Sequence, residues 1–438
     1  VGVFDVSSQT TTSSTIPGVS TKNIGYYAYN GQILAGPSGT VLDTVASWAV
    51  NDIIAVAIDY DNSTVKWYKN NTLVFTKSSA DLKDVTFAFS GTSGSSGYTI
   101  EANFGQKTLA YTPPSGYVAL STANLPDPAI PLPSAHFNTV LYTGNGSTQS
   151  ISGVGHQPDW VWIKNRSAAD NHVLTDAVRG ATIQSGSNLT GAEVTNDDGL
   201  TAFASDGFAI GDDVEVNTNN EAYVSWNWKA NGSGSTNTVG SLDAVVSANA
   251  AAGFSIVTYT GNGSAQSIGH GLSKDLEFLV VKNRDANASW VVQVSTTVND
   301  YMYLNGTDGI QQSSIFGLDI TRSNDGTFYY GGPNYMGANG VDYLAYCFHS
   351  IEGYSKIGSY TGNGNASGPF ISTGFKPAWV MIKRTDSAAE WVMFDNKRSP
   401  FNVVDKVLLA ENSASEYTVA NMLDINSNGF KMRDTHNT

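Results

Sequence analysis

The sequence predicts an all-β protein made of tandem antiparallel β-sandwich domains. Composition is the first reason, because only 14% of the 438 residues are charged, against about 25% in an average globular protein. The chain is rich instead in glycine, with 44 residues, and in aromatic residues, at 11%. Turn formers combined with aromatic and β-branched residues are typical of short strands joined by tight turns.

Internal repetition is the second reason. The motif Tyr-Thr-Gly-Asn-Gly occurs at residues 142–146, 259–263 and 360–364. Each copy is followed, at a similar distance, by an apolar run that ends in a basic residue. These runs occupy residues 160–166, 278–284 and 379–384. Two matched features at a nearly constant offset indicate tandem copies of one folding unit, which usually extend a surface or present a binding face.

Local patterns near the N-terminus are the third reason. Apolar residues fill 53–58, polar residues follow at 59–62, and a second apolar-rich run at 65–69 leads into Asn70-Asn71. This pattern of strand, turn, strand and turn predicts a meander of hairpins.

The same N-terminal region resembles the SPRY family. The resemblance rests on four blocks, at residues 24–31, 52–61, 66–70 and 102–106. It implies a concanavalin-like β-sandwich that binds partners through its loops. The opening strands of that family have no counterpart before Val1, so we expect an N-terminally incomplete domain and a longer polypeptide.

Length and composition shifts divide the chain into several domains, because 438 residues exceed what one core supports. Four prolines in eight residues favour a stiff linker, and a Gly/Ser-rich stretch favours a flexible one. We expect a SPRY-like sandwich over 1–120, the Pro-rich linker over 121–135, a first repeat over 136–230, the flexible linker over 231–252, a second repeat over 253–353 and a third over 354–438.

The repeats also align internally. Fifteen positions separate Phe208 from Tyr223 and likewise Phe328 from Tyr343, and an Asn-rich turn signal precedes each tyrosine, at 219–220 and 339–340. Alternate large residues follow, and alternation places them on one face of a strand that points into a core. These residues are Val224, Trp226 and Trp228 in the first repeat and Leu344, Tyr346 and Phe348 in the second.

The third repeat is expected to be C-terminally incomplete. Its Asn428-Gly429-Phe430 matches Asp206-Gly207-Phe208 of the first repeat and residues 325–328 of the second, and the closing aromatic strand would follow about 15 to 20 residues later. A sandwich without a buried strand would expose a long apolar edge, which natural proteins avoid. We therefore expect the native chain to continue, or another chain to supply the strand.

The repeats resemble an uncharacterised jelly-roll-like module of tailed-bacteriophage virion proteins, which often accompanies a SPRY-like domain. The motif at 142–146 and the strand at 160–166 carry this resemblance. It implies a virion structural protein in a tail fibre, spike or capsid-attached fibre, exposed on the particle surface. Its work would be spacing and adhesion to host glycan or surface protein. The implied partners are other virion proteins and copies of itself, as a homo-oligomer such as a trimer.

Two other functions stay open. One is a capsid decoration or assembly scaffold with no ligand. The other is a polysaccharide depolymerase, which would need two carboxylates in one groove. The segment Asn196-Asp197-Asp198, with acidic residues at 206 and 212–213, could form such a pair or a calcium site. The second repeat has Gly332 and Pro333 where the first has Asp212 and Asp213, so ordinary turns are the alternative interpretation.

Other chemistry finds little support in the sequence. The six histidines form no metal-ligand spacing, and His156 and His270 recur before the apolar strand as turn residues. The single cysteine, Cys347, lies in a strand pattern and fits a small core residue. No Gly-x-Ser-x-Gly elbow and no phosphate-binding glycine loop is present. We therefore expect no enzyme activity, no catalytic residue, no metal and no cofactor.

Net charge and hydropathy limit the classes of partner that we expect. The net charge of −15 would repel a polyanion, so we expect no nucleic-acid partner. No run of 18 consecutive apolar residues occurs, so we expect no membrane insertion.

A tyrosine-rich segment of the second repeat is the candidate ligand site. Tyr329, Tyr330 and Tyr335 stand among Gly and Asn, where the first repeat has mostly small or acidic residues. Rigid rings with polar tips suit adaptable recognition. The alternative is cross-strand aromatic packing on a hairpin.

Overall fold

The structure, a computed structural model, is nearly all β, with 43% strand and 2% helix, which confirms the predicted fold class. It describes residues 2–5, 24–35, 39–59, 61–78, 87–90, 101–121, 124, 128–294, 297–314, 317, 319–320, 326–331 and 335–435. The chain forms two compact units, residues 1–126 and residues 127–438. Each unit is described by itself below.

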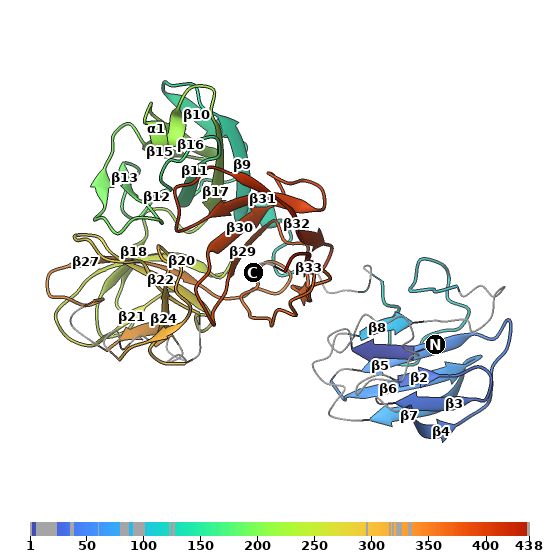
Figure 1. The fold of residues 1–438 in the computed structure, drawn as a ribbon. Coiled ribbons are helices and arrows are strands. Elements are labelled where there is room, and N and C mark those ends of the chain that lie inside the picture. Colours follow the sequence, from blue (N-terminus) through green and yellow to red (C-terminus); the bar gives the residue numbers. More distant parts are fainter. Residues whose placement is uncertain are drawn as a thin grey trace. The chain divides into compact units, whose positions relative to one another are not determined.

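The N-terminal unit is a sandwich of two antiparallel sheets, ordered β4-β3-β2-β1-β8 and β5-β6-β7 (Figure 1). The strands are β1 (Gly2–Asp5), β2 (Ile24–Tyr26), β3 (Gln32–Ala35), β4 (Thr40–Thr44), β5 (Ile54–Asp59), β6 (Thr64–Lys69), β7 (Thr72–Ser78) and β8 (Phe87–Ser90). Side chains from both sheets share one core that includes Ile33 and Trp67. The predicted hairpins are confirmed, and Asn70 and Asn71 form the second turn with φ of 47° and 67°.

The first repeat has a six-stranded sheet, ordered β14-β13-β12-β11-β17-β9, and a three-stranded sheet, ordered β10-β16-β15. Its strands are β9 (Phe137–Thr143), β10 (Gln149–Ser152), β11 (Trp160–Asn165), β12 (Val173–Asp176), β13 (Ile183–Ser185), β14 (Val194–Thr195), β15 (Leu200–Ala204), β16 (Gly207–Ile210) and β17 (Ala222–Trp228). A four-residue helix, α1 (Val214–Asn217), precedes β17. The central strand β17 lies between β9 and β11.

The second repeat uses the same arrangement around its central strand β27, which lies between β20 and β22. Its sheets are ordered β18-β19-β20-β27-β22-β23-β24-β25 and β21-β26. The strands are β18 (Ser235–Asn237), β19 (Ala244–Asn249), β20 (Phe254–Thr260), β21 (Gln266–Gly269), β22 (Phe278–Asn283), β23 (Val291–Gln293), β24 (Asp300–Tyr303), β25 (Gln311–Gln312), β26 (Thr327–Tyr330) and β27 (Asp342–Phe348).

The third repeat has one six-stranded sheet, ordered β28-β33-β32-β31-β30-β29. Its strands are β28 (Phe370–Ser372), β29 (Trp379–Lys383), β30 (Trp391–Asp395), β31 (Val404–Leu409), β32 (Tyr417–Asn426) and β33 (Gly429–Met432). β29 is the counterpart of β11 and β22. It stands at the edge of its sheet, and among the described residues no strand takes the place of β17 or β27 beside it.

The three repeats surround one shared apolar core, seen in Figure 1 as three lobes around a common centre. Alternation along β11 explains this arrangement, because Trp160 and Trp162 face the shared core while Val161 and Ile163 face the core of their own repeat. Both faces of the strand are buried, as its continuous apolar sequence predicts. The second and third repeats contribute in the same way, with Tyr346 and Met393 among the shared residues.

The Tyr-Thr-Gly-Asn-Gly motifs form turns in all three repeats. Their last glycines, Gly146, Gly263 and Gly364, have φ of 67°, 77° and 62°, a conformation that strongly favours glycine. The predicted turns before β17 and β27 are also confirmed, since Asn220 and Gly340 have φ of 63° and 73°.

Both predicted linkers differ from expectation. In the stretch 121–135, residues 133–135 form a short 3₁₀ helix, and Ile130 is buried against Ala252 and Ile351, so this part packs on the second unit. The stretch 231–252 contains β18 and β19, and β19 pairs with β20 along five positions. Its Val246 and Ala244 enter the core of the second repeat, which explains why the segment is ordered despite its glycines and serines.

Candidate functional site

The structure does not bring the three candidate tyrosines together. Tyr330 is fully buried in the core of the second repeat, with its ring stacked 5.9 Å from the ring of Tyr259. A Cβ on Gly337 would lie 2.0 Å from the Tyr330 ring, so this glycine allows the loop to cover it. Tyr329 precedes it on the opposite face of β26, and its backbone pairs with Asp319. The expectation that Tyr330 is available to a ligand is therefore wrong.

Tyr335 belongs to a different group of tyrosines. It is 51% exposed, and with Tyr301 it lies close enough to Tyr303 to add to the effect of burial, which raises the pKa of Tyr303 to about 12. The rings of Tyr301 and Tyr303 meet edge to face at 5.3 Å, and Tyr301 donates its hydroxyl to Gln311 at 2.8 Å. We call Tyr301, Tyr303 and Tyr335 the tyrosine cluster. Sequence reasoning missed its β24 members because they lie some 30 residues from Tyr335.

The acidic residues of the first repeat hold turns. Asp213 caps α1 by accepting from the backbone N–H of Glu215 at 2.7 Å, and its other oxygen accepts from Asn196 at 2.9 Å. Asp206 accepts from the backbone N–H of Gly155 at 2.6 Å, which holds its pKa below the usual range. Within the described residues, no group of three or more His, Cys, Asp or Glu side chains is placed to hold a metal ion.

The histidines and the cysteine also have structural surroundings. His156 Nδ1 lies 3.1 Å from the carbonyl of Ser134, and His270 Nδ1 accepts from the backbone N–H of Leu272 at 3.1 Å, so both belong to turns. Cys347 is fully buried, and burial raises the pKa of its thiol well above the usual range. In the part of the chain that the structure describes, no helix has the length and hydropathy needed to span a bilayer.

Several buried polar side chains lie at the junctions between repeats. A ring nitrogen in each repeat bonds a backbone carbonyl of another repeat, from equivalent positions at the start of β12, β23 and β30. The pairs are His172 with Leu409 at 2.8 Å, Trp290 with Gly186 at 2.8 Å and Trp391 with Tyr303 at 3.0 Å. The first repeat thus contacts the third, the second repeat contacts the first, and the third repeat contacts the second. Head-to-tail contacts of this kind close into a ring with approximate threefold symmetry.

The basic residue after each apolar run repeats this pattern at two junctions. Lys282 donates to the carbonyl of Thr190 at 3.0 Å, and Lys383 donates to that of Thr307 at 2.9 Å. Burial lowers the pKa of Lys282 to about 8, and the charge of Glu193 partly opposes that shift. These lysines therefore join repeats.

Arginine–glutamate pairs reinforce two of the three junctions. Arg284 binds Glu193 through two parallel bonds of 2.9 and 2.8 Å, and Arg166 binds Glu416 through two bonds of the same lengths. Bidentate geometry makes such pairs stronger and more directional than single ion pairs. Each pair is accompanied by a backbone bond, as from Glu193 to the carbonyl of Arg284 at 2.9 Å.

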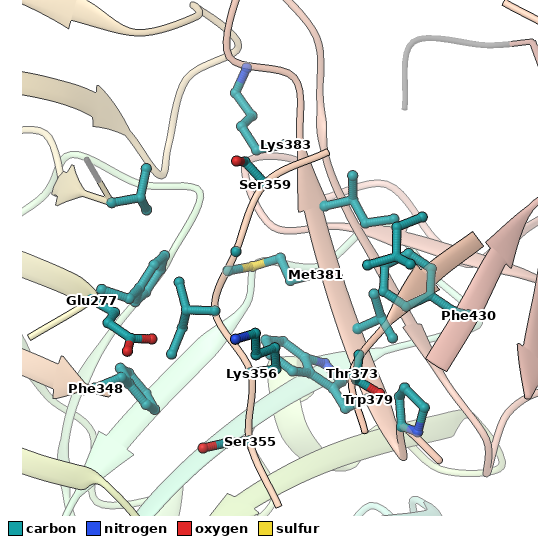
Figure 2. A pocket seen from close by; sticks show the side chains of 18 of the residues that line it. Glu277, Phe348, Ser355, Lys356, Ser359, Thr373, Trp379, Met381, Lys383 and Phe430 are labelled. Carbon is teal, nitrogen blue, oxygen red and sulfur yellow. The ribbon is translucent and has the colours of Figure 1, made fainter. Parts of the chain in front are cut away.

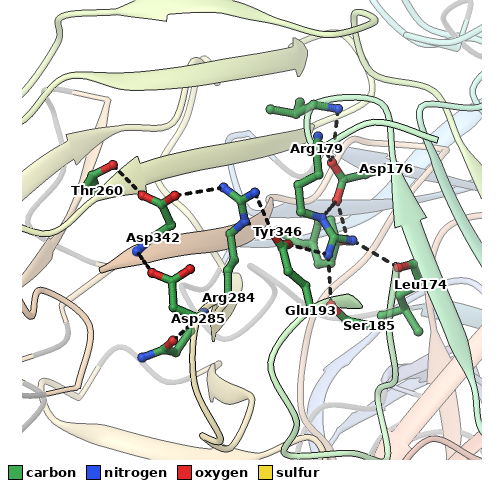
Figure 3. Close-up of polar contacts among 12 residues, drawn as sticks. Leu174, Asp176, Arg179, Ser185, Glu193, Thr260, Arg284, Asp285, Asp342 and Tyr346 are labelled. Carbon is green, nitrogen blue, oxygen red and sulfur yellow. Dashed lines mark hydrogen bonds and ion pairs between the residues drawn. The ribbon is translucent and has the colours of Figure 1, made fainter. Parts of the chain in front are cut away.

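A buried aspartate–arginine pair stands behind each of these contacts. Asp176 accepts from Arg179 at 2.6 Å, both side chains are fully buried, and Asp176 also accepts from the hydroxyl of Tyr346 in the second repeat at 3.0 Å (Figure 3). Burial opposes the charge on Arg179, but Asp176 and its other neighbours raise the arginine pKa overall. Asp395 and Arg398 repeat the pair in the third repeat, where Asp395 accepts from Trp226 Nε1 of the first at 3.2 Å.

The junction between the second and third repeats lacks these charges. Val294 and Thr297 occupy the positions of the aspartate and arginine, counted from the ring residue that begins the strand. Ile310 and Thr385 occupy the positions of the glutamate and arginine, and only the backbone bond from Ile310 to Thr385 remains, at 2.7 Å. This junction is therefore apolar where the other two are charged.

A cavity of about 1720 Å³ lies beside this apolar junction. One side is the edge strand β29, and another is the extended segment 355–361; Figure 2 shows Trp379 and Met381 together with Ser355, Lys356 and Ser359. The second repeat provides further walls, including Phe348 and Val294. We call this space the slot. It is larger than a pocket for a drug-sized molecule, which typically measures about 300–1,000 Å³.

Comparison with known proteins adds one finding. No curated protein and no solved structure matches the chain. A family described as "Domain of unknown function (DUF7483)" matches residues 132–438, which cover the ring of three repeats and more than half of the chain. The chain therefore belongs to the DUF7483 family.

Proposed function

We propose that this chain is a structural protein of a tailed-bacteriophage virion, in a tail fibre, spike or capsid-attached fibre. In this role it spaces other parts of the particle and presents a surface that recognises host glycan or protein. The observation that carries the proposal is the closed ring of three repeats around a shared core rich in aromatic residues. A ring of this kind is a stiff building block, because each repeat is held by two others.

The use of buried charges supports a structural role. The side chains of Arg179, Asp176 and Lys282 are buried ionisable groups of the kind that often mark an active site. Each instead bonds a neighbouring group at a junction between repeats. These buried charges therefore have a structural explanation.

The tyrosine cluster is the surface that we propose for recognition. Tyrosine rings stack on sugar faces, while their hydroxyls bond sugar hydroxyls. Tyr335 is half exposed, and Tyr301 and Tyr303 lie beside it on a strand, so the rings are held in place rather than free to move. Weak single sites of this kind gain avidity when a particle carries many copies.

A glycan array on the purified chain tests recognition. If a glycan binds, Tyr335→Ala should weaken binding about fivefold or more, since one lost ring contact is worth about 1 kcal/mol. The free energy of unfolding should change by less than about 0.5 kcal/mol, because the residue is exposed. Tyr29→Ala is the matched control, since Tyr29 is 97% exposed in the other unit and should leave binding unchanged.

Locating the protein in intact particles by antibody labelling and electron microscopy tests the virion role. Label on a tail or on capsid-attached fibres supports the proposal. Label on the capsid, together with an array that binds nothing, would favour a decoration or scaffold protein. Absence from purified particles would refute the virion role altogether.

A further inference from the structure

The first two repeats show what occupies the place that corresponds to the slot. There the central strand lies between the first strand of the repeat and the strand of the apolar run. In the third repeat, segment 355–361 corresponds to β9 and β20, and β29 corresponds to β11 and β22. The slot separates these two segments, and no described residue forms a strand between them.

Two glycines of the third motif have room that their counterparts lack. A Cβ on Gly144 would lie 2.2 Å from the carbonyl oxygen of Thr218, and one on Gly261 would lie 2.4 Å from that of Ala338. These oxygens belong to the turns before β17 and β27. A Cβ on Gly362 would meet no described atom within 4 Å, and the same holds for Gly364. The third motif thus keeps the glycines that close approach of such a turn requires.

The tyrosine of the third motif has a buried hydroxyl that no described residue bonds. Tyr142 donates to the carbonyl of Val216 at 2.8 Å, and Tyr259 donates to that of Met336 at 3.0 Å, in both cases just before the central strand. The hydroxyl of Tyr360 is buried and has no hydrogen bond among the described residues. A buried polar group left unpaired is costly, so a carbonyl is expected to reach it.

Val294, on the wall that the second repeat contributes, predicts which kind of side chain a strand in the slot would place against it. Asp176 accepts from Tyr346 of β27, and Asp395 accepts from Trp226 of β17, which are equivalent positions of the central strands. At the junction between the second and third repeats, Val294 stands in the place of the accepting aspartate, and it lines the slot. A donor there would be left unpaired, so an apolar ring fits better.

We propose that the slot binds one separate segment of turn plus β-strand, of the same pattern as residues 336–348. The strand lies antiparallel to β29, and its alternate large side chains fall opposite Trp379, Met381 and Lys383. This register follows from the pairs Phe278 with Phe348, Val280 with Tyr346 and Lys282 with Leu344. The residue opposite Met381 is an apolar ring against Val294, and the turn covers Gly362. Strand addition to an open edge supplies main-chain bonds, while the side-chain positions supply specificity.

The test uses a fluorescein-labelled peptide with the sequence of residues 336–349, carrying Cys347→Ser and Tyr346→Phe. Fluorescence anisotropy on the full chain measures binding. We expect saturable binding that is lost when alternate peptide nitrogens are methylated, because methylation removes backbone donors and keeps the side chains. We expect the peptide that retains Tyr346 to bind about tenfold more weakly, since its hydroxyl would face Val294 without a partner.

Two variants of the chain make the test specific. Gly362→Ala should leave the melting temperature unchanged, because its Cβ meets open space, yet weaken peptide binding more than tenfold, because the turn could no longer approach. Val294→Asp should reverse the preference, so that the Tyr346 peptide binds better than the Phe peptide.

Three results would overturn the proposal. One is no binding by the wild-type chain, and a second is equal binding by wild type and Gly362→Ala. The third is a dimer in sedimentation that Met381→Arg dissociates, because a second copy of the chain would then fill the slot.

Discussion

Two junctions of the ring are built from charges, and the third is built from apolar side chains and a slot. The first–second and third–first junctions each combine a fully buried aspartate–arginine pair with a bidentate arginine–glutamate pair. Among the described residues, the second–third junction keeps the hydrogen bonds made by Lys383, Trp391 and the backbone. One ring geometry therefore tolerates two kinds of side-chain chemistry, because backbone carbonyls and ring nitrogens set the register at all three places.

The largest expected difference concerns the buried pair. Arg179→Met leaves Asp176 buried and charged without its partner, and should lower the free energy of unfolding by about 3–5 kcal/mol. Thr297→Met, at the equivalent position of the apolar junction, should change it by less than about 0.5 kcal/mol. Urea denaturation of both variants measures the contrast. Equal losses would mean that the two kinds of junction do not differ in how they depend on charge.

The next largest effect is the pH dependence of stability that His172 gives to the junction containing it. His172 bonds Leu409 where the other junctions use tryptophan, and burial lowers its pKa to about 3. Between its unfolded pKa of about 6.5 and pH 3 the unfolded chain binds the extra proton, so stability falls as pH falls. Lowering the pH from 6.5 to 4.5 should reduce the free energy of unfolding by about 2–3 kcal/mol through this one group.

A double substitution isolates that contribution. His172→Trp with Trp162→Val copies Trp290 and Val280 of the second repeat, and should flatten the acid side of the stability profile. Burial raises the pKa of Glu411 to about 7, which acts in the opposite direction in the same range, so the comparison between variants is the informative measurement. An unchanged pH profile in the double variant would contradict the role given to His172.

Glycine substitutions compare the second repeat, which has a central strand beside its motif, with the third repeat, where the described residues form none. Gly261→Ala forces a Cβ against the carbonyl of Ala338 and should lower the free energy of unfolding by about 1–3 kcal/mol. Gly362→Ala should have almost no effect on stability. Thermal unfolding of the two variants checks this, and a large loss for Gly362→Ala would show that the third motif is already covered.

The smallest effects concern the outer ion pairs. Arg284→Thr removes a pair whose side chains are each 19% exposed, and should cost about 1 kcal/mol. Thr385→Arg with Ile310→Glu places the same pair at the apolar junction and should gain up to about 1 kcal/mol, more at low salt than at high salt. Denaturation at two salt concentrations distinguishes this gain from a packing effect.

The sequence predicted the all-β class, the three repeats and their turns because these depend on local patterns. The alternation of Trp160 to Ile163 and the Asn-Gly turn at 339–340 are such patterns. Ring closure depends on loops far apart in sequence, as in the bond from His172 to Leu409, and no local pattern encodes it. One signal was available, because Asp-x-x-Arg occurs at 176–179 and 395–398, whereas Val294 and Thr297 hold the equivalent positions of the second repeat.

The candidate site was harder to predict than the fold. Tyr330 and Tyr335 are near each other in sequence, yet one lies in the core and the other is exposed, since Tyr330 is the last residue of β26 and Tyr335 lies outside that strand. The tyrosine that does neighbour Tyr335 is Tyr303, from β24. The slot could be anticipated only in part, through the third repeat's unmatched closing strand, because its walls belong to all three repeats.

Because all three repeats lie in one chain, each junction is encoded by its own codons. An assembly of three identical subunits must change all its interfaces together when one residue changes. Here Val294 can differ from Asp176 and Asp395 without altering either of them. Two junctions can therefore keep their buried charges while the third has different side chains. One side of an approximately threefold-symmetric ring then differs from the other two.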